Sequence, residues 1–238
     1  MELFTTQALL NLFTLTGLEI ILGIDNVIFI ALLVQHLEPK RRNKARIMGL
    51  SLALIMRVLM LLGATWIMKL TDPLFHLFSF PMSGRSLLLI FGGLFLVIKT
   101  ILEIKEMFHP DDNQHQNNAQ KESRYLKIIS QIIFIDIILS FDSIITAVGI
   151  SDNFVIMVIA IVIAMIVMIV ASKSIGDFIY NNPSIKVVAL AFIGFLGLIL
   201  VLAGFDIEIN KAYLYFSMLF AGIVEVINIK LRKIKVVN

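Results

Sequence analysis

The sequence predicts an all-α fold: a polytopic membrane helical bundle of about seven transmembrane helices, with an inverted repeat of three helices plus one extra. Three observations support this fold class. Hydrophobic residues make up 59% of the 238 residues and charged residues only 16%, whereas soluble domains carry about 25% charged residues. Apolar runs recur along the whole chain, which excludes a separate soluble catalytic domain. Two of these runs also share one motif.

Seven apolar segments approach the roughly 17–25 residues that a helix needs to cross a bilayer. Breakers and charges separate them, as in HLEPKRRNKAR, TDPLFHLFSFPMSGR and NNPS. The first segment is long and follows no basic stretch, which favours a retained span over a cleaved signal peptide. The chain has no cysteine, so disulfides and thiolate metal sites are excluded. The predicted spans are Leu9–Val34, Ile47–Met68, Ser86–Leu102, Leu126–Ile150, Phe154–Ser172, Lys186–Gly204 and Ala212–Ile229.

Basic residues predict the orientation. Of the 20 Lys and Arg residues, 16 lie after the first, third and fifth spans and in the C-terminal tail. The alternate loops hold only Lys69, Arg85 and Lys211, and Arg57 lies inside the second span. Because cytoplasmic loops are enriched in Lys and Arg, we expect a multi-pass protein of the plasma or inner membrane, with its N-terminus outside and its C-terminus in the cytoplasm. The lipid bilayer is its expected partner, and no nucleic acid is expected.

An internal repeat is carried by two short stretches, LEIILGIDNVI (Leu18–Ile28) and IDIILSFDSII (Ile135–Ile145). A weaker match joins LIFGGLFLVI (Leu89–Ile98) to LAFIGFLGLI (Leu190–Ile199). The repeat unit therefore has three spans, and an odd number gives the two copies opposite orientations, as in many secondary transporters. The motifs align Glu19 with Asp136, Asp25 with Asp142, and Asn26 with Ser143.

This repeat predicts four parts of the chain. Residues 1–104 form the first transmembrane repeat, 105–125 a cytoplasmic linker, 126–204 the second repeat, and 205–238 the seventh span with a basic cytoplasmic tail. The linker contains HPDDNQHQNN, with Asp111, Asp112 and His115. Its composition favours a solvated, flexible segment over a metal sensor, and the sequence leaves metal sensing there open.

Ionisable residues inside the predicted spans are the candidate functional residues. Each charge at the bilayer centre costs at least about 2.5–3.5 kcal/mol. Five acids face one arginine, so pairing cannot neutralise them all, and the surplus must be protonated or must hold a cation. The six residues are Glu19, Asp25, Arg57, Asp136, Asp142 and Glu225.

Helical geometry places Glu19 and Asn26 on one stripe and turns Asp25 away from it. Gly23 lies between them, and local unwinding there would turn Asp25 toward Glu19 and free backbone carbonyls as ligands. In the second copy Ser140 takes the place of this glycine, which makes a break there less secure.

Carboxylate, amide and hydroxyl groups are hard oxygen donors that suit Mg²⁺, Ca²⁺ or Mn²⁺. We therefore predict a site for a transported divalent cation, with no permanently bound cofactor. On the unpaired last span, Glu225 either completes this site with Asn228 or pairs with Arg57, and both alternatives stay open. The predicted metal ligands are Glu19, Asp25, Asn26, Asp136, Asp142 and Ser143, supported by Gly23, Arg57, Glu225 and Asn228.

The twin motifs EIILGIDN and DIILSFDS resemble the TerC family of integral membrane proteins. So do ITAVG after the second motif, SIGDF (Ser174–Phe178), which we expect to form a loop turn, and the spacing of seven spans. The family is named for tellurium resistance, several members are implicated in manganese export, and it is grouped with the LysE-type transporters. The resemblance implies a divalent-cation exporter of short form whose functional acids are Glu19, Asp25, Asp136 and Asp142.

The leading hypothesis is therefore efflux of Mn²⁺ or a similar ion, coupled to protons, by a protein that is not an enzyme. The chain has no Walker A sequence, which argues against ATP drive. One alternative is a membrane scaffold or subunit in metal or tellurite stress resistance. A remote alternative is an intramembrane aspartyl protease with Asp142 paired to Asp136 or Asp177, but two equivalent acid pairs do not fit one proton-sharing dyad.

Overall fold

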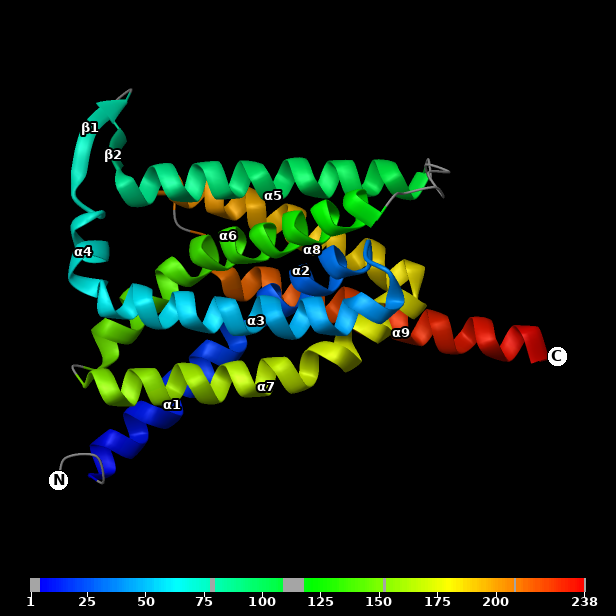
Figure 1. The fold of residues 1–238 in the computed structure, drawn as a ribbon, viewed down its shortest axis with the longest axis horizontal. Coiled ribbons are helices and arrows are strands. Elements are labelled where there is room, and N and C mark those ends of the chain that lie inside the picture. The colour runs from blue at the N-terminus through cyan, green and yellow to red at the C-terminus, as the bar shows by residue number, and fades with distance from the viewer. Residues whose placement is uncertain (1–4, 78–79, 109–117, 152, 208, 238) are drawn as a thin grey trace. The chain divides into compact units, whose positions relative to one another are not determined.

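The computed structural model describes residues 5–77, 80–108, 118–151, 153–207 and 209–237. Within these ranges, seven helices are long and apolar enough to cross a membrane. The predicted all-α polytopic bundle is therefore confirmed (Figure 1). The chain divides into two compact units, and each unit combines segments from both halves of the sequence.

The first unit, residues 1–72 and 113–177, is centred on the long helix α6. This helix contacts α1, α2, α3 and α4 (Figure 1). Large apolar side chains such as Leu15, Leu50 and Ile132 are almost fully buried between these helices. The elements are α1 (Thr6–Leu22), α2 (Ile24–Val34), α3 (Pro39–Leu62), α4 (Ala64–Lys69), α6 (Asn118–Ile150) and most of α7 (Phe154–Asn181).

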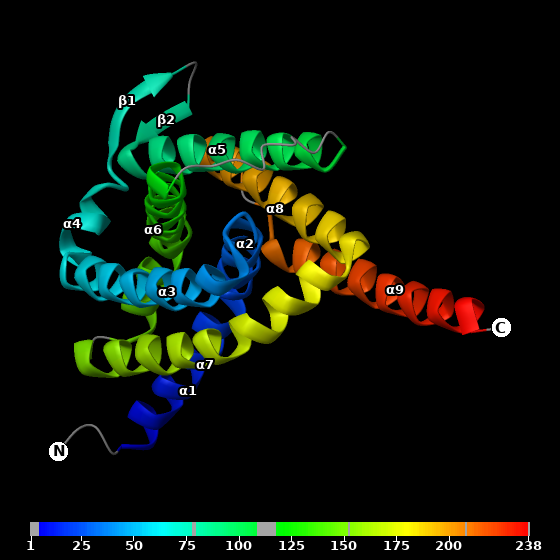
Figure 2. The same cartoon turned by 45° about the vertical axis from the view of Figure 1, so that its right-hand side comes forward.

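The second unit, residues 73–112 and 178–238, contains a small hairpin and three helices. Helix α5 packs along α8, and α9 also contacts α8 (Figure 2). A Cβ atom at Gly197 would lie 2.8 Å from the carbonyl oxygen of Gly93, so these glycines permit a close approach of the two backbones. The elements are β1 (Pro73–Leu77), antiparallel to β2 (Phe80–Ser83), α5 (Gly84–Phe108), α8 (Pro183–Gly204) and α9 (Lys211–Val237).

Local chemistry explains the helix ends. The Thr5 hydroxyl accepts a hydrogen bond from the Ala8 amide and caps α1, and Pro39 stands at the start of α3, where its missing N–H costs nothing. Helix α3 ends at Leu62, with Gly63 as its C-cap, before the predicted limit at Met68. Helix α6 begins upstream of its apolar stretch because Gln, Lys, Glu and Arg there favour helix.

The predicted linker 105–125 therefore overlaps two helix ends, since residues 105–108 and 118–125 are helical. Residues 109–117, which include Asp111, Asp112 and His115, lie outside the described residues. Metal sensing by this segment stays a prediction.

The expected loop turn at SIGDF is wrong, because Ser174–Phe178 lies within helix α7, which continues to Asn181. The next helix breaker is Pro183, so nothing ends the helix earlier. Gly176 instead makes room for another side chain. A Cβ atom there would lie 2.7 Å from an Arg46 guanidinium nitrogen. The motif is therefore part of a helix, and its glycine leaves room for the Arg46 side chain to pack against α7.

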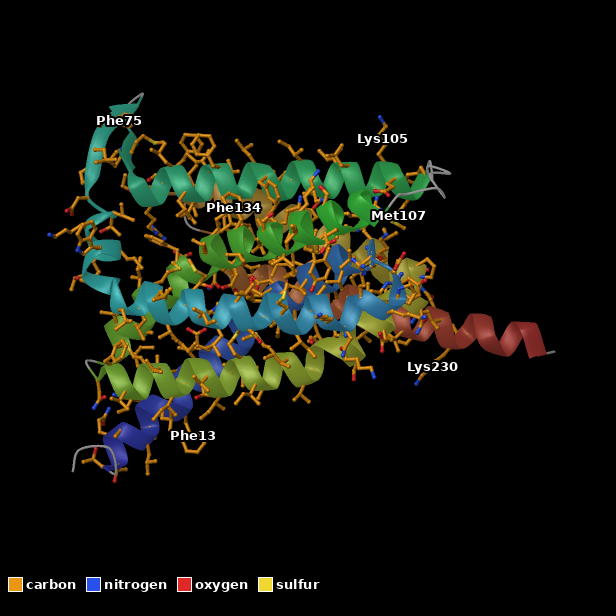
Figure 3. The ribbon with its side chains drawn as sticks, in the orientation of Figure 1. Phe13, Phe75, Lys105, Met107, Phe134 and Lys230 are labelled. Carbon is orange, nitrogen blue, oxygen red and sulfur yellow. The ribbon has the colours of Figure 1, made fainter. Side chains whose placement is uncertain are left out.

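The exposed surfaces of these helices are apolar. Phe13 on α1 is 75% exposed and Phe134 on α6 is 47% exposed (Figure 3). On α9, Phe216 is 71% exposed. Large aromatic and aliphatic side chains on the outside, with charged side chains buried inside, are the arrangement expected for helices that lie in lipid.

Candidate functional site

The first motif is interrupted at Gly23, as the sequence predicts. Helix α1 ends at Leu22 and α2 begins at Ile24. The Gly23 amide donates to the Ile20 carbonyl at 3.2 Å, and the Gly23 carbonyl accepts from the Val27 amide at 3.1 Å. The break is thus confined to one residue, Gly23, between the two acids of the motif.

Glycine is required at this break for packing. A Cβ atom at Gly23 would collide with the Met168 sulfur of α7 and would lie 2.9 Å from the Glu19 carbonyl oxygen. The backbone at Gly23 is otherwise ordinary, with φ of −94°. Met168 was missed by the sequence analysis, since nothing in the sequence shows which helix covers the motif.

Asp25 and Asn26 lie in the first turn of α2 and are both buried. Asp25 Oδ1 accepts a hydrogen bond from the backbone N–H of Asn26 at 2.8 Å. A carboxylate at a helix N-terminus is favoured by the helix dipole. Asp25 also attracts the guanidinium of Arg57 electrostatically. A second buried acid of the first motif thus lies within the field of this arginine.

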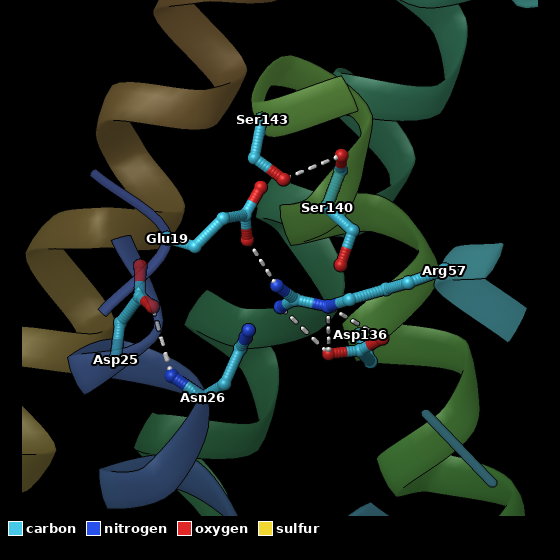
Figure 4. Close-up of polar contacts among 7 residues, drawn as sticks. All are labelled: Glu19, Asp25, Asn26, Arg57, Asp136, Ser140 and Ser143. Carbon is cyan, nitrogen blue, oxygen red and sulfur yellow. Dashed lines mark hydrogen bonds and ion pairs between the residues drawn. The ribbon is translucent and has the colours of Figure 1, made fainter. Parts of the chain in front are cut away.

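Arg57 is the centre of the cluster and is only 2% exposed. Its Nη1 donates to Glu19 Oε2 at 2.7 Å, and its Nη2 donates to Asp136 Oδ1 at 3.0 Å. Its Nε lies 3.3 and 3.4 Å from the two carboxylate oxygens of Asp136. Figure 4 shows the guanidinium between the two acids. Two carboxylates thus share one guanidinium, so this group carries a formal net charge of −1.

Three elements bring these charges together. Glu19 lies near the end of α1, Arg57 in α3 and Asp136 in α6, and α6 contacts both other helices. Glu19 and Asp136 are the aligned acids of the two motifs, so the matched segments meet at one point. The sequence predicted both acids, but it did not reveal that they share Arg57.

Neutral polar groups complete the surroundings. The Ser143 hydroxyl lies beside Glu19 and donates to the Ser140 carbonyl at 3.0 Å (Figure 4). Within the described part of the chain, the Asn26 amide oxygen and nitrogen and the Ser140 hydroxyl are buried without a hydrogen-bond partner. Such groups are rare in folded proteins and costly. Of these atoms, the Asn26 amide oxygen and the Ser140 hydroxyl oxygen can serve as ligands of a hard cation, whereas the amide nitrogen can only donate. In the sequence, Ser140 stands out only as the residue in place of Gly23, where a helix break is less secure, and this alignment was the signal for its place here.

Asp142 lies on another face of α6 and is half-buried. The helix is continuous through Ser140, so Asp142 lies about 120° around the axis from Asp136. Its predicted ligand role stays a prediction. The second motif thus differs from the first, because serine does not interrupt its helix.

Glu225 and Asn228 lie on α9 in the second unit. The Asn228 side-chain amide donates to Glu225 Oε2 at 3.3 Å, whereas Oε1 is buried without a partner among the described residues. Their supporting roles also stay predictions.

The arrangement suits a hard cation. It offers carboxylate, amide and hydroxyl oxygens in a buried place, and such donors prefer Mg²⁺, Ca²⁺ or Mn²⁺ over soft metals. The charge of −1 on the Arg57 group, together with the nearby Asp25, leaves negative charge that a cation or protons can balance.

Comparisons with known proteins place the chain among membrane proteins. Residues 4–236 match the model of the Integral membrane protein TerC family. A UPF0053 protein of Haemophilus influenzae is 46% identical over 228 residues, which are 96% of each chain. The UPF0053 inner membrane protein YgdQ of Escherichia coli K12 is 46% identical over 94% of this chain and 93% of its own. The UPF0053 inner membrane protein YoaE of the same strain is 43% identical over 92% of this chain but only 42% of its own. No solved structure matches the chain.

Proposed function

Because the chain belongs to the TerC family of integral membrane proteins, we propose that it is a secondary transporter that exports Mn²⁺ or a similar hard divalent cation. One observation carries the proposal: Glu19 and Asp136, from two matched segments, converge in the interior of the first unit with oxygens that have no hydrogen-bond partner among the described residues. Polar groups inside membrane proteins are expensive, and they mark ion pathways far more often than packing positions.

The donor set supports a divalent ion that binds reversibly. Carboxylates offset the dehydration of a hard cation, and the neutral oxygens of Asn26 and Ser143 add ligands without adding charge. A site with fewer charges releases its ion more readily, which a carrier requires. Asp142, the counterpart of Asp25 in the second motif, is proposed as the fourth acid of the site.

We propose that protons drive the export. Carboxylates can hold either a cation or protons, so entry of protons releases the ion on the outer side. Intramembrane acids serve as proton relays in many transporters. The absence of a Walker A sequence agrees with this mode of coupling.

The proposed location is the bacterial inner membrane, because the relatives YgdQ and YoaE are named inner membrane proteins, with the N-terminus outside and the C-terminus inside. The asymmetry of basic residues supports this orientation. Single cysteines at the exposed residues Asp72 and Glu122 should react with an impermeant thiol reagent from outside and from inside, respectively. Labelling of both residues from one side would exclude the inverted repeat.

Transport by purified protein tests the function. Liposomes loaded with radioactive Mn²⁺ should lose it faster with the protein than without it, and a proton gradient directed against the Mn²⁺ movement should increase the rate. A scaffold or a subunit in stress resistance moves no ion, so equal loss from both preparations would contradict the proposal. A protease dyad is disfavoured by Asp136, which is bound to Arg57 and lies on a different helix face from Asp142.

A further inference from the structure

The Arg57 guanidinium engages three of the four carboxylate oxygens of Glu19 and Asp136. It contacts both oxygens of Asp136 and one oxygen of Glu19, at 2.7–3.4 Å. A guanidinium only donates hydrogen bonds and is always charged. A positive charge of the chain itself therefore neutralises part of the proposed cation site.

The neutral donors of the same cluster are left over. The Asn26 amide oxygen and the Ser140 hydroxyl are buried without partners among the described residues, whereas the acids beside them are bound to Arg57. The site thus contains two kinds of oxygen. The carboxylates of Glu19 and Asp136 are paired with the guanidinium, whereas the Asn26 and Ser140 side-chain oxygens have no hydrogen-bond partner among the described residues. A divalent ion can use both sets only if the guanidinium leaves the acids, because two like charges at contact distance repel strongly.

We propose that Arg57 is a tethered counter-cation: it neutralises Glu19 and Asp136 when no divalent ion is bound, and it leaves them when the ion binds. This inference rests on the proposed transport function. Buried acids that lose their only cation are strongly unfavourable. Arg57 therefore stabilises the ion-free carrier, and protons need to serve only the acids that it does not hold.

This role separates two kinds of transport. Net export requires the ion-free carrier to change from its outward-facing back to its inward-facing conformation, and that step depends on Arg57. Exchange of external for internal Mn²⁺ returns the carrier with an ion bound, so it does not depend on Arg57. Loss of the guanidinium should then impair net export and spare exchange. It should also strengthen Mn²⁺ binding, because the ion no longer displaces a competing charge.

The experiment compares wild type, Arg57→Gln and Arg57→Lys, each purified in the presence of Mn²⁺. Equilibrium binding of radioactive Mn²⁺ should be tighter in Arg57→Gln by about tenfold or more, within the usual range of coupling between two competing interactions. In liposomes, Arg57→Gln should retain exchange and lose net export. Arg57→Lys keeps the charge but cannot bridge both acids as a planar fork, so it should show intermediate binding and slowed net export.

Three results would overturn the inference: weaker or unchanged Mn²⁺ binding by Arg57→Gln, equal loss of exchange and net export, or wild-type behaviour in both assays. If Arg57→Gln does not accumulate in the membrane, Arg57→Lys decides. Tighter binding with slowed net export supports the tethered counter-cation, and wild-type values contradict it. A wild-type protein that moves no Mn²⁺ at all would instead remove the proposed function itself.

Discussion

At the scale of single residues, the buried charges define the candidate site. The sequence predicted Glu19 and Asp136 as aligned acids, because an ionisable residue in an apolar span is conspicuous whatever the fold. It could not assign the partner of Arg57, for which Glu225 was one candidate. Ion pairing depends on which helices face each other, and spacing along the chain does not contain that information. The observed partners of Arg57 are Glu19 and Asp136.

The same reasoning explains the residues that were missed. Ser140 and Met168 are ordinary members of apolar helices, and only their neighbours give them significance. Ser140 has a buried hydroxyl without a partner among the described residues, and Met168 covers the helix break at Gly23.

Replacing Arg57 by Met should destabilise the ion-free protein much more than replacing Arg46 by Met. Both arginines are buried in α3, and Met preserves much of their length. Loss of one partner from a buried ion pair costs about 3–5 kcal/mol, and Arg57 serves two acids. Arg46 Nη2 forms an ion pair at 4.0 Å with Oδ1 of Asp177, whose side chain is 59% exposed. Ion pairs with a solvent-exposed partner contribute about 0–1 kcal/mol to the free energy of unfolding.

Thermal unfolding in detergent without divalent metal measures this difference. The melting temperature of Arg57→Met should fall well below that of Arg46→Met. Equal melting temperatures for the two variants would show that the Arg57 pairs contribute little to stability.

At the scale of elements, apolar length and breakers predicted the spans well, because bilayer thickness constrains helix length. The helix ends were less predictable. Polar helix formers extended α6 upstream to Asn118, and α7 ran through SIGDF to Asn181. The first motif breaks at Gly23 and the second stays helical at Ser140. The two motifs therefore differ in backbone structure at one aligned position, where the first has Gly23 and the second has Ser140.

Gly23→Ala should disturb the site, whereas Gly17→Ala should not. A Cβ atom at Gly23 meets Met168 and the Glu19 carbonyl, whereas one at Gly17 in α1 meets nothing within 4 Å. Overpacking costs about 1–3 kcal/mol, and alanine in an open helical position gains up to about 1 kcal/mol over glycine. The melting temperature and the rate of Mn²⁺ export should both fall for Gly23→Ala only. If both variants behave alike, the close packing at the break has no functional importance.

At the scale of the whole molecule, the sequence repeats and the compact units divide the chain differently. The first unit holds α1 to α4 with α6 and most of α7, and the second holds α5 with α8 and α9. The third helices of the two repeats, α5 and α8, pack against each other. The division into repeats 1–104 and 126–204 stays a prediction about symmetry. The compact units are formed by contacts between segments that are distant in the sequence. Which helices contact each other cannot be predicted from the order of the spans along the chain.

If acids from both motifs serve one cation site, export of radioactive Mn²⁺ from loaded vesicles must depend on the acids of each motif. Asp25→Asn and Asp142→Asn keep the side-chain shape, remove one charge from each motif, and spare the acids that bind Arg57. At matched protein levels, each should reduce export by about tenfold or more, as loss of a ligand or its support usually does. Asp177→Asn, an exposed acid outside the cluster, should export like wild type. Near-normal export by both Asp25→Asn and Asp142→Asn would contradict a shared site.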